Sequence, residues 1–150
     1  MRVVIQRVKH ASVTIEGTVR SSIERGLLVF VGIEERDTSE DVDWLVRKTA
    51  ALRIFDDGHG VMNLSVVDIG GEMLVVSQFT LHALTKKGNR PSYIRSAGEA
   101  LAKSLYEAFV ASLSAATGRP IGTGEFGANM QVELLNDGPV TIWIDSRQKE

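Results

Sequence analysis

A run of eight residues without a polar side chain, Gly26–Ile33, sets the main limit on how this chain folds. The run is rich in β-forming residues, is bounded by glycine and is too short for most helices. These properties predict a strand that is buried on both faces. Because such a strand must be covered on each side, other elements have to pack over it.

Several other segments also have strand patterns. Apolar and polar residues alternate from Val3 to Ile15, until Gly17 breaks the pattern. Residues 73–80 predict a second buried strand, and residues 64–67 predict a short one. The C-terminal segment 130–145 alternates on both sides of Asn136-Asp137-Gly138-Pro139, which predicts a hairpin.

Two segments have helical periodicity. From Thr38 to about Leu52, apolar side chains recur every three or four residues, and Thr38 with Asp41 predicts a capping box. From Ser96 to Gly118 a second apolar stripe predicts another helix, with Ser96 and Glu99 as its capping box. Since strands dominate, we expect an α/β fold with a mixed, mostly antiparallel, barrel-like sheet covered by two main helices.

The composition is that of one globular domain spanning residues 1–150, with 43% apolar residues. The sequence has no cysteine, which excludes a disulfide framework, a thiolate nucleophile and a cysteine-ligated metal. The N-terminal residues do not resemble a signal peptide, and no apolar run approaches the ~18 residues of a membrane span. We therefore expect a cytoplasmic protein with no membrane partner.

The net charge of −2 gives no overall attraction for nucleic acid, so any such contact needs a local basic patch. Residues 82–95 contain Lys86, Lys87, Arg90 and Arg95 without any acidic residue. A solvated surface loop is one interpretation of this segment. A loop that contacts phosphates is the other.

Common catalytic motifs are missing from the sequence. It has no G-x-S-x-G, H-E-x-x-H, P-loop or G-x-G-x-x-G pattern, and His10, His59 and His82 lack the spacing of metal ligands. His82 follows a predicted strand and could act as a general base, but a surface or loop histidine is the favoured interpretation. We therefore expect neither a metal nor a cofactor.

Two segments carry unusual polar groups. In Val75–Leu81, a strand would place Gln78 and Thr80 on one face, either capped by neighbours or open to a ligand. In Asn136–Thr141, the Gly138-Pro139 bond could be cis at a cost of ~0.5–1 kcal/mol. The two carbonyls would then point the same way and could accept hydrogen bonds from an ammonium group, although a plain turn is the favoured interpretation of the segment by itself.

Together these two segments resemble the signature motifs of the D-aminoacyl-tRNA deacylase family. Tyr93 stands where the family more often has phenylalanine. Further similar segments follow the family order along nearly the whole chain: Ile5–Val8, Ala11–Val13, Gly26–Val29, Arg53–Phe55, Met62-Asn63, Gly88–Ser92 and Ala128–Val132.

The resemblance implies hydrolysis of the ester bond of D-aminoacyl-tRNA, and of mischarged glycyl-tRNA, with rejection of L-aminoacyl-tRNA. It implies a homodimer whose active site lies at the subunit interface, with a cis Gly138-Pro139 reaching into the partner's pocket to hold the α-amino group. The expected partners are the aminoacyl-tRNA 3′ end and a second copy of the chain, without DNA, metal or cofactor.

The resemblance also assigns roles to individual residues. Ser77 and its neighbours would bind the terminal adenosine and the ester carbonyl. Gln78 would orient the substrate, and the N–H groups around Phe79 and Thr80 would form an oxyanion hole. Thr80 has no adjoining base, so we expect it to position groups while the ribose 2′-OH helps to activate water.

Outside these motifs, the resemblance implies that Arg7 orients the Gly-Pro segment, that Met130 lines the pocket, and that Lys86, Lys87 and Arg90 contact tRNA phosphates. Simple packing or surface charge is the alternative for Arg7 and Met130. Two other functions stay open: an editing domain of the same fold that removes an L-amino acid, and a non-catalytic module that binds the tRNA end.

Overall fold

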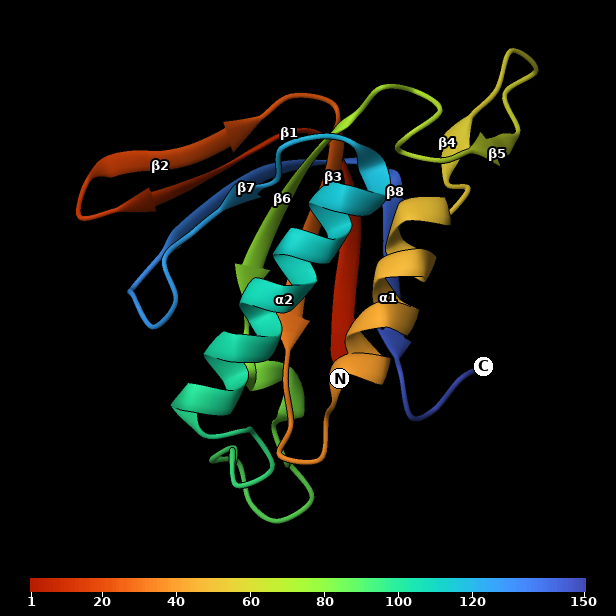
Figure 1. The fold of residues 1–150 in the computed structure, drawn as a ribbon. Coiled ribbons are helices and arrows are strands. Elements are labelled where there is room, and N and C mark those ends of the chain that lie inside the picture. Colours follow the sequence, from red (N-terminus) through yellow and green to blue (C-terminus); the bar gives the residue numbers. More distant parts are fainter.

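The computed structural model describes residues 1–150 and has two helices side by side on one face of a curved sheet (Figure 1). The strands of this sheet are β1 (Arg2–Ile15), β2 (Thr18–Ile23), β3 (Gly26–Gly32), β6 (Glu72–Ser77), β7 (Gly122–Thr123) and β8 (Gln131–Asp145). The remaining elements are the helices α1 (Ser39–Ala51) and α2 (Glu99–Thr117), the 3₁₀ turn η1 (Phe79–His82), and a small hairpin of β4 (Phe55–Asp56) and β5 (Met62–Leu64).

Strand β1 organises the sheet. It pairs with β8 on one edge and with β2 and β3 on the other, always antiparallel, whereas β3, β6 and β7 run parallel to one another. The predicted mixed, mostly antiparallel sheet is therefore confirmed. β3 and β6 approach closely at Gly26, where a Cβ atom would lie 1.8 Å from the Glu72 carbonyl oxygen, so only glycine fits there.

The core lies between the helices and the sheet. In α1 the predicted stripe of Val42, Leu45, Val46 and Thr49 is buried, because these residues share one face of the helix. The capping box is also confirmed, since the Asp41 carboxylate accepts a hydrogen bond from the Thr38 N–H at 2.9 Å. No helix is long and apolar enough to cross a lipid bilayer.

The predicted capping box of the second helix is wrong. α2 begins at Glu99 with Gly98 as its N-cap, and no side chain caps it. The Ser96 hydroxyl instead donates a hydrogen bond to the Phe79 carbonyl at 3.0 Å, because the chain still runs along η1 at that point. The predicted end is confirmed, since Gly118 adopts a left-handed conformation with φ of 66°.

The predicted C-terminal hairpin is also wrong. β8 is one strand that pairs with β1 on both sides of Gly138-Pro139. Between the pairs Val8–Asn136 and Gln6–Thr141, β1 advances two residues while β8 advances five. The extra residues form a bulge rather than a turn, because both halves of the segment find partners on the same long strand.

Two further strands are present but have other bounds than predicted. The strand predicted over 73–80 ends at Ser77, and η1 begins two residues later at Phe79. The short strand predicted over 64–67 lies earlier, as β5. The chain turns after Leu64 because the Asp68 carboxylate accepts the Ser65 N–H at 2.8 Å and so competes with strand pairing.

Candidate active site

The polar segment at the end of β6 leaves the sheet as a tight turn. The Gln78 N–H still donates to the Val31 carbonyl at 2.7 Å, and η1 starts at the next residue. The predicted alternation of faces therefore stops at Ser77. The turn brings Gln78 and Thr80 together, and the Gln78 amide donates to the Thr80 hydroxyl at 2.5 Å.

The turn also frees two backbone donors. Phe79 and Thr80 are the first two residues of η1, so their N–H groups have no acceptor within it. The carbonyls of residues 78–81 are all engaged: those of Gln78 and Thr80 accept from backbone N–H groups, that of Phe79 accepts from Ser96, and that of Leu81 accepts from Arg2. The beginning of η1 is thus a fixed pair of hydrogen-bond donors of the kind that stabilises an oxyanion.

An apolar cavity of about 300 Å³ opens beside these donors. Met130 lines it and packs against Gly124. The Phe79 ring stands at the cavity, is 57% exposed and meets Tyr93 edge to face at a centroid distance of 5.0 Å. The other wall residues include Val31, Val76, Ala97, Phe126 and Asn129. An apolar group of a ligand fits such a cavity.

The Gly138-Pro139 bond is cis and lies exposed in the bulge of β8. The Arg7 side chain is buried next to this bulge. Its guanidinium donates to the Asp137 carbonyl at 3.0 Å and to the Ile54 carbonyl at 2.6 Å, so it links the bulge to the segment around Ile54. Arg7 is thus hydrogen-bonded to the residue that precedes Gly138.

Within one chain, the two motif segments do not meet. Ser77 is level with Val31 and Val3 across the sheet, whereas the Gly-Pro bulge lies opposite Arg7, between the pairs of Gln6 and Val8. Four residues of strand separate these levels, which is about 13 Å, and three strand spacings of about 4.8 Å lie between β8 and β6. The Gln78 turn and the Gly138-Pro139 loop are therefore well separated both along and across the sheet.

The basic segment follows η1 directly. A short ladder between Leu84 and Ser92 closes it into a loop, whose tip exposes Lys86, Lys87 and Arg90. None of the three forms an ion pair with an acidic side chain. Their charges are free to meet anions on the same side of the molecule as the turn.

His82 is not the surface or loop histidine that the sequence favours. It is the last residue of η1, is 1% exposed, and neither ring nitrogen makes a well-formed hydrogen bond. It therefore cannot serve as a base for Thr80. Burial lowers its pKa, and the charges of Arg2 and the N-terminal ammonium lower it further, while the Gly32 carbonyl and the Glu34 carboxylate oppose them.

We predict that His82 makes the protein less stable in acid. His82 has a pKa near 6.5 in the unfolded chain and a lower pKa in the folded chain, so the unfolded chain takes up the proton first as the pH falls. The contribution of His82 to the free energy of unfolding is therefore full above pH 6.5 and decreases below it. One proton gives a slope of at most about 1.4 kcal/mol per pH unit. Urea unfolding between pH 7.5 and 5.5 measures it, and His82→Leu is expected to flatten the slope. Equal slopes in both proteins would contradict this.

Sequence comparison with known proteins gives matches over nearly the whole chain. The family model for D-Tyr-tRNA(Tyr) deacylase matches residues 4–145. Proteins named D-aminoacyl-tRNA deacylase are 63% identical in Bacteroides thetaiotaomicron and 58% identical in Chromobacterium violaceum, each over 100% of both chains.

Two solved structures have the same fold. A c-Myc DNA unwinding element binding protein superposes with a TM-score of 0.91 at 41% identity, over 97% of this chain and 98% of that one. A probable eukaryotic D-amino acid tRNA deacylase superposes with a TM-score of 0.80 over 95% of this chain and 97% of that one, and at 18% identity it supports the fold alone. With its sequence matched from end to end and its sheet and helices superposed, the chain belongs to the D-Tyr-tRNA(Tyr) deacylase family.

Proposed function

We propose that this protein hydrolyses the ester bond between a D-amino acid and the terminal ribose of tRNA, and that it also clears glycine but rejects L-aminoacyl-tRNA. The observation that carries the proposal is the free N–H pair of Phe79 and Thr80 beside an apolar cavity, in a chain of this family. The products are free D-amino acid and intact tRNA. The reaction belongs in the cytoplasm, where aminoacyl-tRNA is used.

In the proposed reaction, water adds to the ester carbonyl while the N–H groups of Phe79 and Thr80 bind the developing oxyanion. The C–O bond to the ribose then breaks, and the ribose oxygen leaves with a proton. The neighbouring 2′-OH relays the proton from the attacking water. Thr80 acts as a positioning group, because its hydroxyl accepts the Gln78 amide and has no base beside it to activate it.

The cavity supplies the subsite for the terminal adenosine. Met130 and Phe79 offer apolar contact to a base, and Ser77 and Gln78 lie at the edge where the ribose would pass. The loop with Lys86, Lys87 and Arg90 would meet the phosphates that precede the adenosine. Phosphate contacts carry no sequence information, which suits an enzyme that acts on many tRNAs.

The chiral filter needs a second copy of the chain. In one chain the Gly138-Pro139 loop lies three strand spacings across the sheet from Gln78 and four residues further along it, so it can serve only the site of a partner. Exposed apolar side chains support such a contact, since Phe79 is 57% exposed and both Leu135 and Trp143 are 47% exposed. In the homodimer, the backbone carbonyls of this loop accept the α-ammonium of a D-residue.

Rejection of the L-isomer follows from the same contact. With its ammonium on these carbonyls, an L-residue would direct its side chain into the loop backbone. Otherwise it would leave the ammonium and the carbonyls unpaired, at about 1–3 kcal/mol per group. Glycine has no side chain to collide and would pass.

The test compares D-tyrosyl-tRNA and L-tyrosyl-tRNA as substrates of the purified protein. We expect the D-ester to be hydrolysed at least about 30-fold faster, because two unpaired groups cost at least about 2 kcal/mol together. Equal rates would contradict the chiral filter, and preferred cleavage of the L-ester would favour an editing domain. Tight binding of both esters without cleavage would favour a binding module.

A further inference from the structure

We infer that Ser96 and Arg2 are positioning residues for deacylation. Their side chains donate hydrogen bonds to the carbonyls of Phe79 and Leu81 in η1. These bonds fix the direction in which the N–H groups of Phe79 and Thr80 point. The inference rests on the proposed role of these N–H groups. The sequence alone suggests a helix cap for Ser96 and nothing for Arg2.

Ser96 acts on one peptide group of the turn. Its hydroxyl donates to the Phe79 carbonyl at 3.0 Å. This carbonyl and the Thr80 N–H belong to the same planar peptide unit and point in opposite directions. Fixing the carbonyl therefore fixes the direction of the N–H. The hydrogen bond also polarises the peptide, which makes the Thr80 N–H a stronger donor.

Arg2 acts on the neighbouring peptide through one more hydrogen bond. Its guanidinium donates to the Leu81 carbonyl at 2.9 Å, and the Leu81 N–H donates to the Gln78 carbonyl at 3.2 Å. The Gln78 carbonyl shares a peptide plane with the Phe79 N–H. Holding Leu81 in place therefore restrains the direction in which the Phe79 N–H points.

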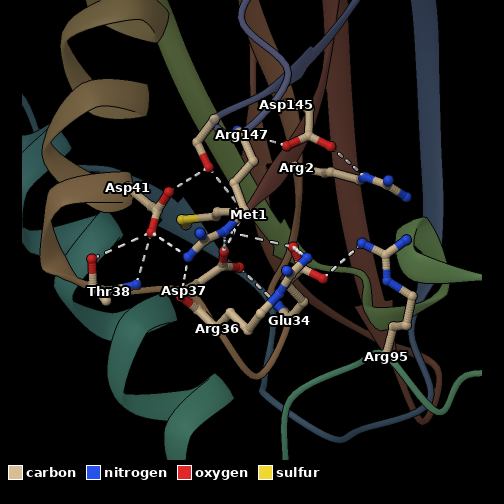
Figure 2. Close-up of polar contacts among 11 residues, drawn as sticks. Met1, Arg2, Glu34, Arg36, Asp37, Thr38, Asp41, Arg95, Asp145 and Arg147 are labelled. Atoms are coloured by element: carbon tan, nitrogen blue, oxygen red, sulfur yellow. Dashed lines mark hydrogen bonds and ion pairs between the residues drawn. The ribbon is translucent and has the colours of Figure 1, made fainter.

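Asp145 keeps the Arg2 guanidinium in place. The Arg2 Nε donates to the Asp145 carboxylate at 2.8 Å, and Figure 2 shows the two side chains facing each other. Burial alone would raise the pKa of Asp145, but hydrogen bonds from Arg2 and from the Arg147 N–H bring it below its usual value. The carboxylate is thus ionised, and Arg2 links Asp145 at the end of β8 to the Leu81 carbonyl in η1.

The main experiment replaces Ser96 by alanine. We expect kcat for D-tyrosyl-tRNA to fall about tenfold, which is about 1.4 kcal/mol, while KM stays the same, because the oxyanion contact forms only in the transition state. The Thr80 amide proton is expected to move upfield in NMR spectra. Ser96→Thr keeps a hydroxyl and is expected to restore both readouts. Arg2→Ala is expected to lower kcat and to shift the Phe79 amide instead.

Ser114→Ala is the matched control. The Ser114 hydroxyl donates to the Arg119 carbonyl at 2.7 Å at the far end of α2, so its loss is expected to leave kcat unchanged. A Thr80 amide that does not move in Ser96→Ala would overturn the inference, whatever happens to activity. A Thr80 amide that moves while kcat stays constant would instead overturn the proposed oxyanion role of the turn.

Discussion

A Gly138→Ala variant is expected to hydrolyse D-tyrosyl-tRNA about 100-fold more slowly than the unmodified protein, since a displacement of about 1 Å in a binding group costs roughly that much. Gly138 has a φ of 119°, a backbone angle that residues with a Cβ rarely adopt. An added Cβ would lie 2.6 Å from an Arg7 guanidinium nitrogen and 3.0 Å from a Val140 methyl group. Because Arg7 is buried and held by two carbonyls, the loop has to move instead.

Hydrolysis rates on the D- and L-esters measure this effect, with Gly17→Ala as the control. Gly17 also has a positive φ, of 77°, but a Cβ there would meet nothing within 4 Å. Gly17→Ala therefore strains the backbone at a positive φ but makes no steric clash, and it is expected to keep full activity. Full D-ester hydrolysis by Gly138→Ala would exclude the loop from substrate binding.

The second large effect is expected from Phe79→Pro. Proline removes the Phe79 N–H, and it is tolerated at the first position of a helical turn, where Phe79 lies. Loss of one oxyanion donor is typically worth about 10²–10³ in rate. We expect kcat to fall by that factor while the melting temperature changes little, as measured by single-turnover hydrolysis and thermal unfolding.

Two variants separate the amide from the side chains. Phe79→Ala deletes the exposed ring but keeps the N–H, so it is expected to weaken substrate binding more than kcat. Thr80→Ala deletes the hydroxyl that accepts the Gln78 amide, and it is expected to keep substantial activity. Complete loss of activity in a folded Thr80→Ala variant would instead indicate a threonine nucleophile.

Local sequence was enough for the elements whose determinants are close together. The stripe of Val42, Leu45 and Val46 determines α1 within two helical turns, and Asp41 caps it from three residues away. The run Gly26–Ile33 identifies β3 in the same way, because a strand buried on both faces needs no alternation.

The failures occurred where a distant partner decides the structure. The Asn136–Pro139 segment has good turn chemistry, but β1 pairs on both sides of it and makes it a bulge. Ser96 would cap a helix if η1 did not present the Phe79 carbonyl to it. His82 is buried by its place at the end of η1, which the strand prediction over 73–80 did not anticipate.

The candidate site was predictable as a set of residues but not as a geometry. Gln78 and Thr80 share one side because of a turn, not because of strand alternation. Arg2 has partners 79 and 143 residues away in the sequence, so no local pattern could reveal it.

The separation of Gln78 from Gly138-Pro139 has a genetic consequence under the proposed dimer. Each chain contributes the donor turn to one site and the stereochemical gate to the other. A defect at Gly138 would then leave the turn of its own subunit intact and impair the site across the interface. When two damaged alleles are expressed together, one altered at the gate and one at the turn, mixed assemblies would contain one wholly unaltered site and one doubly altered site.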